Sequence, residues 1–107
     1  MELESIIMEL VVNSGEARNN ALEAIEAAQK QDYEQADKKM KVCEEALSRA
    51  HAFQTKLLSE EAGGESNTPI SLILIHGQDH LMNAMTVRDL ARHMIQMCRL
   101  FYEKEGN

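Results

Sequence analysis

The stretch ISLILIHGQDHLM, residues 70–82, decides the fold of this chain. Its first six residues form an apolar run that is typical of a buried strand but also of a buried helix. Its second half places two histidines and an aspartate within five residues. Whether this stretch is strand or helix therefore fixes both the fold class and the geometry of a candidate site.

The composition of the 107-residue chain favours helices. Aromatic residues make up only 4%, Trp is absent, and the 44% hydrophobic share includes seven Met. Strands are enriched in β-branched and aromatic residues, whereas Leu, Met and Ala favour helices. One Pro and five Gly are too few for the many turns of an all-β domain. We expect a single domain, residues 1–107, with a modest core.

Apolar residues recur at steps of three and four through the first 58 residues, which is the spacing of one helix face. The pattern breaks at Gln31-Asp32, and Asp32 followed by Gln35 resembles a helix-capping box. We therefore expect two helices, over residues 3–28 and 33–58, joined by a connection so short that they must be antiparallel. Gly15 interrupts the first pattern and is expected to mark close packing or a slight bend.

The segment EAGGESNTP, residues 61–69, is the clearest loop signal. Its Gly-Gly pair can end a helix, and Thr68-Pro69 offers an N-cap followed by proline at the first helical position. Residues 70–75 then begin a third helix that continues through Phe101, because the single glycine after this run supplies too little turn chemistry for a strand to end there. The predicted fold is an all-α, antiparallel three-helix bundle.

The start of this third helix is apolar around its whole circumference. A helix that is apolar on every side is buried on every side. Two partner helices from the same chain leave part of it uncovered, so we predict an oligomer with third helices clustered near its axis. The alternative is a monomer that exposes an apolar strip. The residues concerned are Ile70, Leu72, Ile73, Leu74 and Ile75.

The net charge of −7 argues against a nucleic-acid partner, because a phosphate backbone would be repelled. Basic and acidic residues are interspersed, so no basic cluster indicates a membrane surface. The sequence shows no secretory signal and no apolar run of the ~20 residues that span a bilayer. Cys43 and Cys98 lack metal-type spacing and fall at apolar periodic positions. We expect both to be reduced, buried thiols of a cytoplasmic protein.

The polar cluster of residues 76–80 falls within one turn of the predicted helix. His76, Asp79 and His80 share one face at this spacing. Gln78 points to nearly the opposite side, so it cannot easily serve the same pocket in the same chain. In a symmetric oligomer it could serve the pocket of a neighbour.

Three functions are compatible with this cluster. In the first, purely structural, the histidines end an apolar helix and Asp79 fixes a tautomer, although burying an unpaired carboxylate is costly. In the second, His76 and His80 bind zinc in a hydrolase, because HGQDH loosely resembles the inverted zincin pattern; no third ligand is evident. In the third, an imidazole carries a phosphoryl group, which requires in-line positioning more than a deep cleft. A module that only binds other helices is a further alternative.

Three motifs, in the same order, resemble enzyme IIA of the lactose/cellobiose class of the sugar phosphotransferase system. HGQDHLM (76–82) matches the family's His-Ala-Gln-Asp-His-Leu-Met. AHAFQTKLLSEEAGGE (50–65) is similar to its Ala-His-x-x-Gln-Thr-x-Leu stretch, and SGEARNNALEA (14–24) resembles its Gly-x-Ala-Arg segment. The resemblance covers essentially the whole chain.

The resemblance implies a trimer in which His76 accepts phosphate from the phosphohistidine of HPr and passes it to a cysteine of enzyme IIB. Membrane contact is then indirect, through the transporter component that couples phosphorylation to entry of a disaccharide such as lactose, cellobiose or chitobiose. Asp79 matches a metal-binding residue of the family, which implies one Mg²⁺ per trimer on the threefold axis. Gln78 and His80 are implied to orient the phosphoryl group, with Gln78 reaching it from the adjacent subunit.

A few positions depart from the family pattern or stand beside it. Gly77 replaces the usual Ala and is expected to leave room beside the first histidine of the motif. Asn19 stands where Ser is common. We expect Arg18 in an exposed salt bridge rather than on phosphate, His51 in a packed and hydrogen-bonded position, and His93 on the solvent face.

Overall fold

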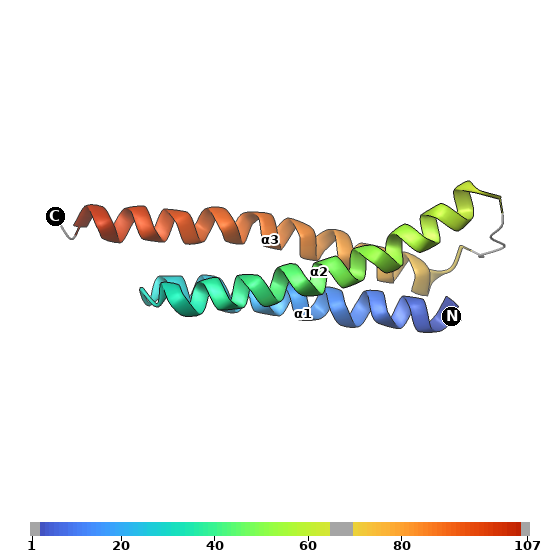
Figure 1. Ribbon diagram of the computed structural model, residues 1–107, viewed down its shortest axis with the longest axis horizontal. Helices are drawn as coiled ribbons and strands as arrows, with labels where there is room; N and C mark the ends of the chain where they lie inside the picture. The colour runs from blue at the N-terminus through green and yellow to red at the C-terminus, as the bar shows by residue number, and fades with distance from the viewer. Residues whose placement is uncertain (1–2, 65–69, 106–107) are drawn as a thin grey trace.

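The computed structural model describes residues 3–64 and 70–105, and these form three α-helices and no strand. Helix α1 spans Leu3–Gln29, α2 spans Tyr33–Ala62 and α3 spans Leu72–Glu105. Each helix runs antiparallel to the one before it in the sequence (Figure 1). The bundle is elongated, with extents of 61 × 20 × 19 Å. The predicted all-α, antiparallel architecture is confirmed.

A tight turn joins α1 to α2. The N–H of Asp32 donates to the carbonyl of Ala27 at 2.9 Å. The N–H of Gln31 donates to the carbonyl of Ala28 at 3.0 Å, and Gln31 itself takes a left-handed φ of 62°. This pair of bonds is the Schellman arrangement that ends many helices. Asp32 Oδ1 then accepts a hydrogen bond from the N–H of Gln35 at 3.2 Å, which confirms the predicted N-cap of α2.

Helix α3 begins at Leu72, three residues after the predicted first helical position. Ile70 and Ser71 precede the helix. The Ser71 hydroxyl accepts a hydrogen bond from the N–H of Leu74 at 3.2 Å, and the Ser71 carbonyl accepts one from the N–H of Ile75 at 3.1 Å. Serine is favoured here because its side chain satisfies an N–H group that the first turn leaves unpaired. The predicted cap at Thr68-Pro69 lies outside the described residues.

Small residues line the core. Many buried positions are alanine, and the largest side chains without solvent exposure include Leu10, Leu81 and Cys43. Small side chains allow helices to approach closely, and α1 packs against both other helices. Helices α2 and α3 share less contact. The last turns of α2, yellow-green in Figure 1, diverge from the other two helices, and the end of α3 extends past the α1–α2 turn.

Two glycines in the helices have different surroundings. A Cβ added at Gly15 would have no atom within 4 Å, so the close packing expected there is absent. Gly77 is buried, and a Cβ there would lie 3.4 Å from Ile7 Cγ2 and 3.8 Å from Leu10 Cβ. The missing side chain of Gly77 therefore faces α1. The expectation that it leaves room beside His76 is wrong, because position 77 is the point where α3 approaches α1.

The cysteines are both free thiols. Cys43 is buried as predicted, whereas Cys98 is only partly buried. Burial raises the pKa of the Cys43 thiol to about 11, and the negative charge of Glu44 acts in the same direction. Within residues 3–64 and 70–105, no helix has both the length and the apolar character that crossing a bilayer requires.

Candidate phosphoryl-transfer site

The predicted cluster lies on the surface of the first turns of α3. His76 and Asp79 are exposed, and His80 is half-buried. The imidazoles of His76 and His80 meet edge to face, with ring centroids 4.3 Å apart and an interplanar angle of 75°. The helical spacing therefore places these side chains on one side of α3, as predicted. An exposed imidazole flanked by a second ring is open to a reactant but restricted in its rotation.

An open groove of about 610 Å³ lies beside His76. Three apolar side chains line it together with His76 and Asp79. Leu72 is 85% exposed, and Ile73 and Ile75 are each 54% exposed. Their own chain leaves these side chains uncovered, which agrees with the prediction that two partner helices cannot cover this part of α3.

Exposed apolar side chains continue along the same side of α3 as far as Phe101, at the spacing of one helix face. Large exposed apolar surfaces mark sites of association with other molecules. We define the outer face of α3 as the exposed residues Leu72, Ile75, Asp79, Met82, Leu90, Met94, Met97 and Phe101.

Asp79 is a carboxylate set among these apolar residues. Its Oδ2 accepts a hydrogen bond from Asn83 Nδ2 at 3.3 Å, one turn further along the helix. A carboxylate oxygen is the donor type that Mg²⁺ prefers. No group of three or more His, Cys, Asp and Glu side chains that could hold a metal ion occurs within the described part of one chain. Asp79 therefore suits a cation only if other chains add ligands, and the zinc alternative on His76 and His80 has no third ligand here.

Gln78 points away from this cluster, as its position in the helix predicted. It is half-buried, and its Oε1 accepts a hydrogen bond from Gln54 Nε2 of α2 at 2.7 Å. This contact was not predicted from the sequence, although Gln54 lies in the second matched motif. The contact between Asp79 and Asn83 was not predicted either, although their spacing of four residues could have revealed it.

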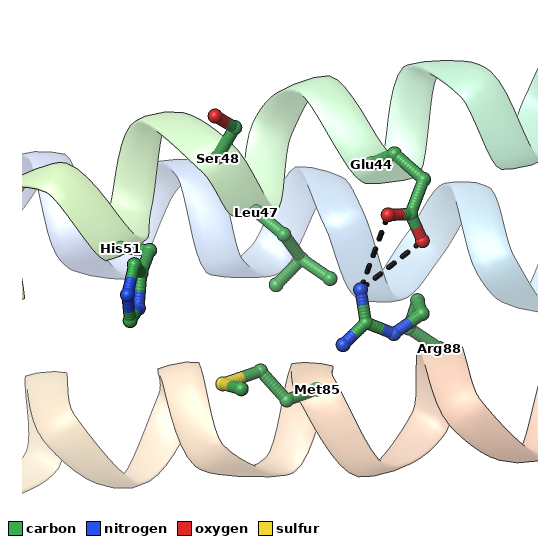
Figure 2. A pocket seen from close by; sticks show the side chains of 6 residues that line it. All are labelled: Glu44, Leu47, Ser48, His51, Met85 and Arg88. Carbon is green, nitrogen blue, oxygen red and sulfur yellow. Dashed lines mark hydrogen bonds and ion pairs between the residues drawn. The ribbon is translucent and has the colours of Figure 1, made fainter.

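His51 is exposed on α2 and lines a cleft between α2 and α3 of about 270 Å³. Figure 2 shows its ring pointing toward α3. The packed position predicted for it is wrong, because its side chain is exposed at the edge of this cleft. In the same cleft, Arg88 Nη1 donates to both carboxylate oxygens of Glu44 at 3.1 and 3.2 Å. These charges are paired with each other, so they hold the helices together.

Two remaining expectations concern Arg18 and His93. His93 is exposed, as predicted. Arg18 is also exposed, but the ion pairs within the described part of the chain do not include it, so the predicted salt bridge is wrong. The arginine that pairs with this part of α1 is Arg49, whose Nη2 lies 3.0 Å from Glu16 Oε2 and whose Nε donates to Asn13 Oδ1 at 2.9 Å.

Comparison with known proteins gives a consistent result. A sequence model of the family "PTS system, Lactose/Cellobiose specific IIA subunit" matches residues 5–99. The lichenan-specific phosphotransferase enzyme IIA component of Bacillus subtilis (strain 168) is 46% identical over 105 residues, which cover 98% of this chain and 94% of that protein.

Solved structures agree with this match. The PTS cellobiose-specific enzyme IIA from Bacillus anthracis has a TM-score of 0.91 at 45% identity, covering 97% of this chain and 95% of that one. The IIA(chitobiose) chain from the IIA(chitobiose)–HPr complex of Escherichia coli has a TM-score of 0.81 at 37% identity, covering 95% and 98%. The chain therefore belongs to the lactose/cellobiose-specific enzyme IIA family of the phosphotransferase system.

Proposed function

We propose that this chain is a cytoplasmic phosphotransferase component with a phosphohistidine intermediate. His76 accepts a phosphoryl group from phospho-HPr and passes it to a cysteine of enzyme IIB during uptake of a disaccharide of the lactose, cellobiose and chitobiose class. The observation that carries the proposal is the exposure of His76 on α3, in a chain of this family. A relative with the same fold forms a complex with HPr, which supports HPr as the donor.

The chemistry needs a ring nitrogen that phosphorus can approach in line. The lone pair of an unprotonated His76 nitrogen forms the new N–P bond while the N–P bond in HPr breaks, and the electrons of that bond return to the imidazole of HPr. In the second step a thiolate of enzyme IIB attacks phosphorus, and the N–P electrons return to His76. The transfer demands positioning rather than an enclosed cavity, and the exposed ring of His76 is open to a partner protein.

His80 and Gln78 act as supporting groups in this proposal. The ring of His80 restricts rotation of the His76 ring, since their centroids are only 4.3 Å apart. Gln78 lies on another side of α3 and therefore orients the phosphoryl group carried by an adjacent subunit.

We propose further that three chains assemble around a threefold axis through the outer faces of α3. This arrangement would cover the exposed apolar side chains, which include Leu72 at 85% and Met97 at 67% exposure. It would also bring one Asp79 carboxylate from each chain to the axis. Three carboxylates repel one another unless a cation neutralises them, and one Mg²⁺ per trimer, held by the three Asp79 side chains, would supply that charge.

The carrier function is tested by mixing the purified protein with HPr that carries labelled phosphate. We expect one phosphoryl group per chain, complete loss of labelling in His76→Ala, and full labelling in the control His93→Ala, which removes another exposed imidazole from the same helix. Label that persists in His76→Ala would contradict the assignment.

The assembly is tested by sedimentation equilibrium in Mg²⁺ and in EDTA. The expected mass is three times the 12.1 kDa of one chain. Asp79→Leu should keep or strengthen the trimer, because removal of three mutually repelling carboxylates offsets loss of the cation. Dissociation of this variant into monomers would show that the proposed arrangement around the axis is wrong.

A further inference from the structure

The hydrogen bond between Gln54 and Gln78 links the candidate site to α2. Its length is 2.7 Å, and both side chains are half-buried. Among the described residues, it is the one side-chain hydrogen bond that joins residues 72–83 of α3 to another helix. This hydrogen bond therefore fixes the side-chain amide of Gln78. In the proposed function, that amide lies beside a phosphoryl group.

We propose that Gln54 is a positioning residue that selects which end of the Gln78 amide faces the phosphoryl group. The inference rests on the proposed function. A glutamine amide has an oxygen that accepts hydrogen bonds and a nitrogen that donates two. Because Gln78 Oε1 accepts from Gln54, both N–H groups of Gln78 are left to donate elsewhere. Phosphoryl oxygens only accept hydrogen bonds, so this orientation is the one that binds them.

The phosphoryl group in question belongs to an adjacent chain. Gln78 and His76 are two positions apart, which places them about 200° apart around the helix. In a ring with cyclic symmetry, one side of each α3 meets a different side of the next α3. The Gln78 side of one chain then faces the His76 side of its neighbour. Gln54 affects the rate of phosphoryl transfer only by orienting Gln78.

Two substitutions of Gln54 distinguish loss of the hydrogen bond to Gln78 from reversal of its direction. Gln54→Leu removes the hydrogen bond and lets the Gln78 amide rotate. Gln54→Glu keeps a hydrogen bond but reverses its direction, because a carboxylate only accepts, so the Gln78 carbonyl would turn toward the phosphoryl group. We expect kcat/KM for transfer from phospho-HPr to fall about three- to tenfold in Gln54→Leu and more than tenfold in Gln54→Glu.

A double-mutant cycle provides the decisive measurement. Gln78→Leu should lower kcat/KM about tenfold, as expected for one hydrogen bond to a charged group, and adding Gln54→Leu should lower it no further. The matched control is Gln96→Leu, because Gln96 is exposed and lies five helical turns along α3 on the side of Gln78. This control should transfer phosphate at the wild-type rate.

A spectroscopic measurement reads the orientation without relying on transfer rates. In ¹⁵N-labelled protein, phosphorylation should shift the side-chain amide signals of Gln78, and Gln54→Leu should reduce that shift. Unchanged transfer in Gln54→Leu, or effects of the two substitutions that multiply, would overturn the positioning role. If the wild-type chain takes no phosphoryl group and behaves like His76→Ala, the proposed function itself fails. If the wild type is phosphorylated normally and Gln54→Leu has no effect, only the positioning role fails.

Discussion

The two halves of α3 are held in different ways. From Arg88 onward, charged side chains tie α3 to α2. Arg88 Nη1 and Arg92 Nη2 lie 3.1 and 2.8 Å from Glu44 Oε1, and Arg99 Nη2 lies 3.0 Å from Asp37 Oδ1. Before Arg88, the side-chain hydrogen bond from α3 to another helix within the described residues is the one between Gln54 and Gln78.

Aromatic residues reinforce the same difference. The guanidinium of Arg99 lies 4.6 Å from the centre of the Tyr33 ring, and the Tyr33 hydroxyl donates to the carbonyl of Cys98 at 3.3 Å. The Tyr102 hydroxyl donates to the carbonyl of Gln29 at 3.1 Å. Both halves expose apolar side chains on the outer face. The second half of α3 therefore differs in its several polar contacts within its own chain, whereas the first half leaves the imidazole of His76 and the carboxylate of Asp79 exposed to partners.

The largest effect on stability is expected at Leu81, which has no exposed surface and belongs to the main core. Leu81→Ala should lower the free energy of unfolding by about 2–5 kcal/mol at every protein concentration, because it leaves a cavity. Leu72→Ala, at an 85% exposed position, should destabilise only at concentrations where chains associate. Urea denaturation at several concentrations measures both. A concentration-independent loss of similar size in the two variants would contradict the view that Leu72 is covered by other chains and not by its own.

A smaller effect is expected at Glu44, where two arginines converge. Glu44→Gln should lower the free energy of unfolding by about 1–2 kcal/mol. It removes the carboxylate charge of Glu44 that pairs with Arg88, whose side chain is only 17% exposed. Gln78→Leu, in the first half, should lower it by less, about 0.5–1 kcal/mol, because it removes one hydrogen bond between uncharged, half-buried amides. Chemical denaturation of the two variants measures both free energies of unfolding. A larger loss of stability in Gln78→Leu than in Glu44→Gln would contradict the stronger polar attachment of the second half.

A comparable change of opposite sign is expected at Gly15. Gly15→Ala should raise the free energy of unfolding by about 0.5–1 kcal/mol, because a Cβ meets no atom within 4 Å and alanine favours the helix. Gly77→Ala should gain less, since its Cβ would lie 3.4 Å from Ile7 Cγ2. Thermal unfolding of both variants tests this. Destabilisation by Gly15→Ala would mean that position 15 contacts a neighbour in the assembly.

The effect of the Cys43 thiol on stability ranks last, because it is absent at neutral pH and appears only in alkaline solution. Folding raises the pKa of the Cys43 thiol from 9.0 to about 11, chiefly through burial. Between these values the unfolded chain releases a proton that the folded chain keeps, so stability should fall as pH rises from 9 to 11 and should not change through this group below pH 9. Cys43→Ala should lack this part of the decrease. Identical pH dependence of unfolding in the two proteins would contradict it.

Sequence periodicity predicted the helices and the antiparallel turn well, because these depend on local spacing. The cap at Asp32 and the shared side of His76 and Asp79 follow from residues within one turn of each other. The start of α3 was placed three residues early, because Thr68-Pro69 and Ser71 are all residue types that begin helices, and spacing alone does not choose between them.

Contacts between helices could not be predicted in the same way. Gln54 and Gln78 are 24 residues apart in sequence, and their contact depends on how two helices are rotated and aligned. The exposure of His51 likewise depends on how α2 and α3 are placed on either side of the cleft that it lines. The motifs pointed to the correct segments, whereas the pairing of their side chains needed the folded structure.

The most direct test of the central claim, that the open first half of α3 carries the phosphoryl group, is to locate that group in the intact wild-type protein. The protein would be phosphorylated with phospho-HPr and the modified residue identified by fragmentation mass spectrometry. The predicted result is one phosphoryl group per chain on His76, with none on His51, His80 or His93. A phosphoryl group on another residue, or on none, would contradict the account.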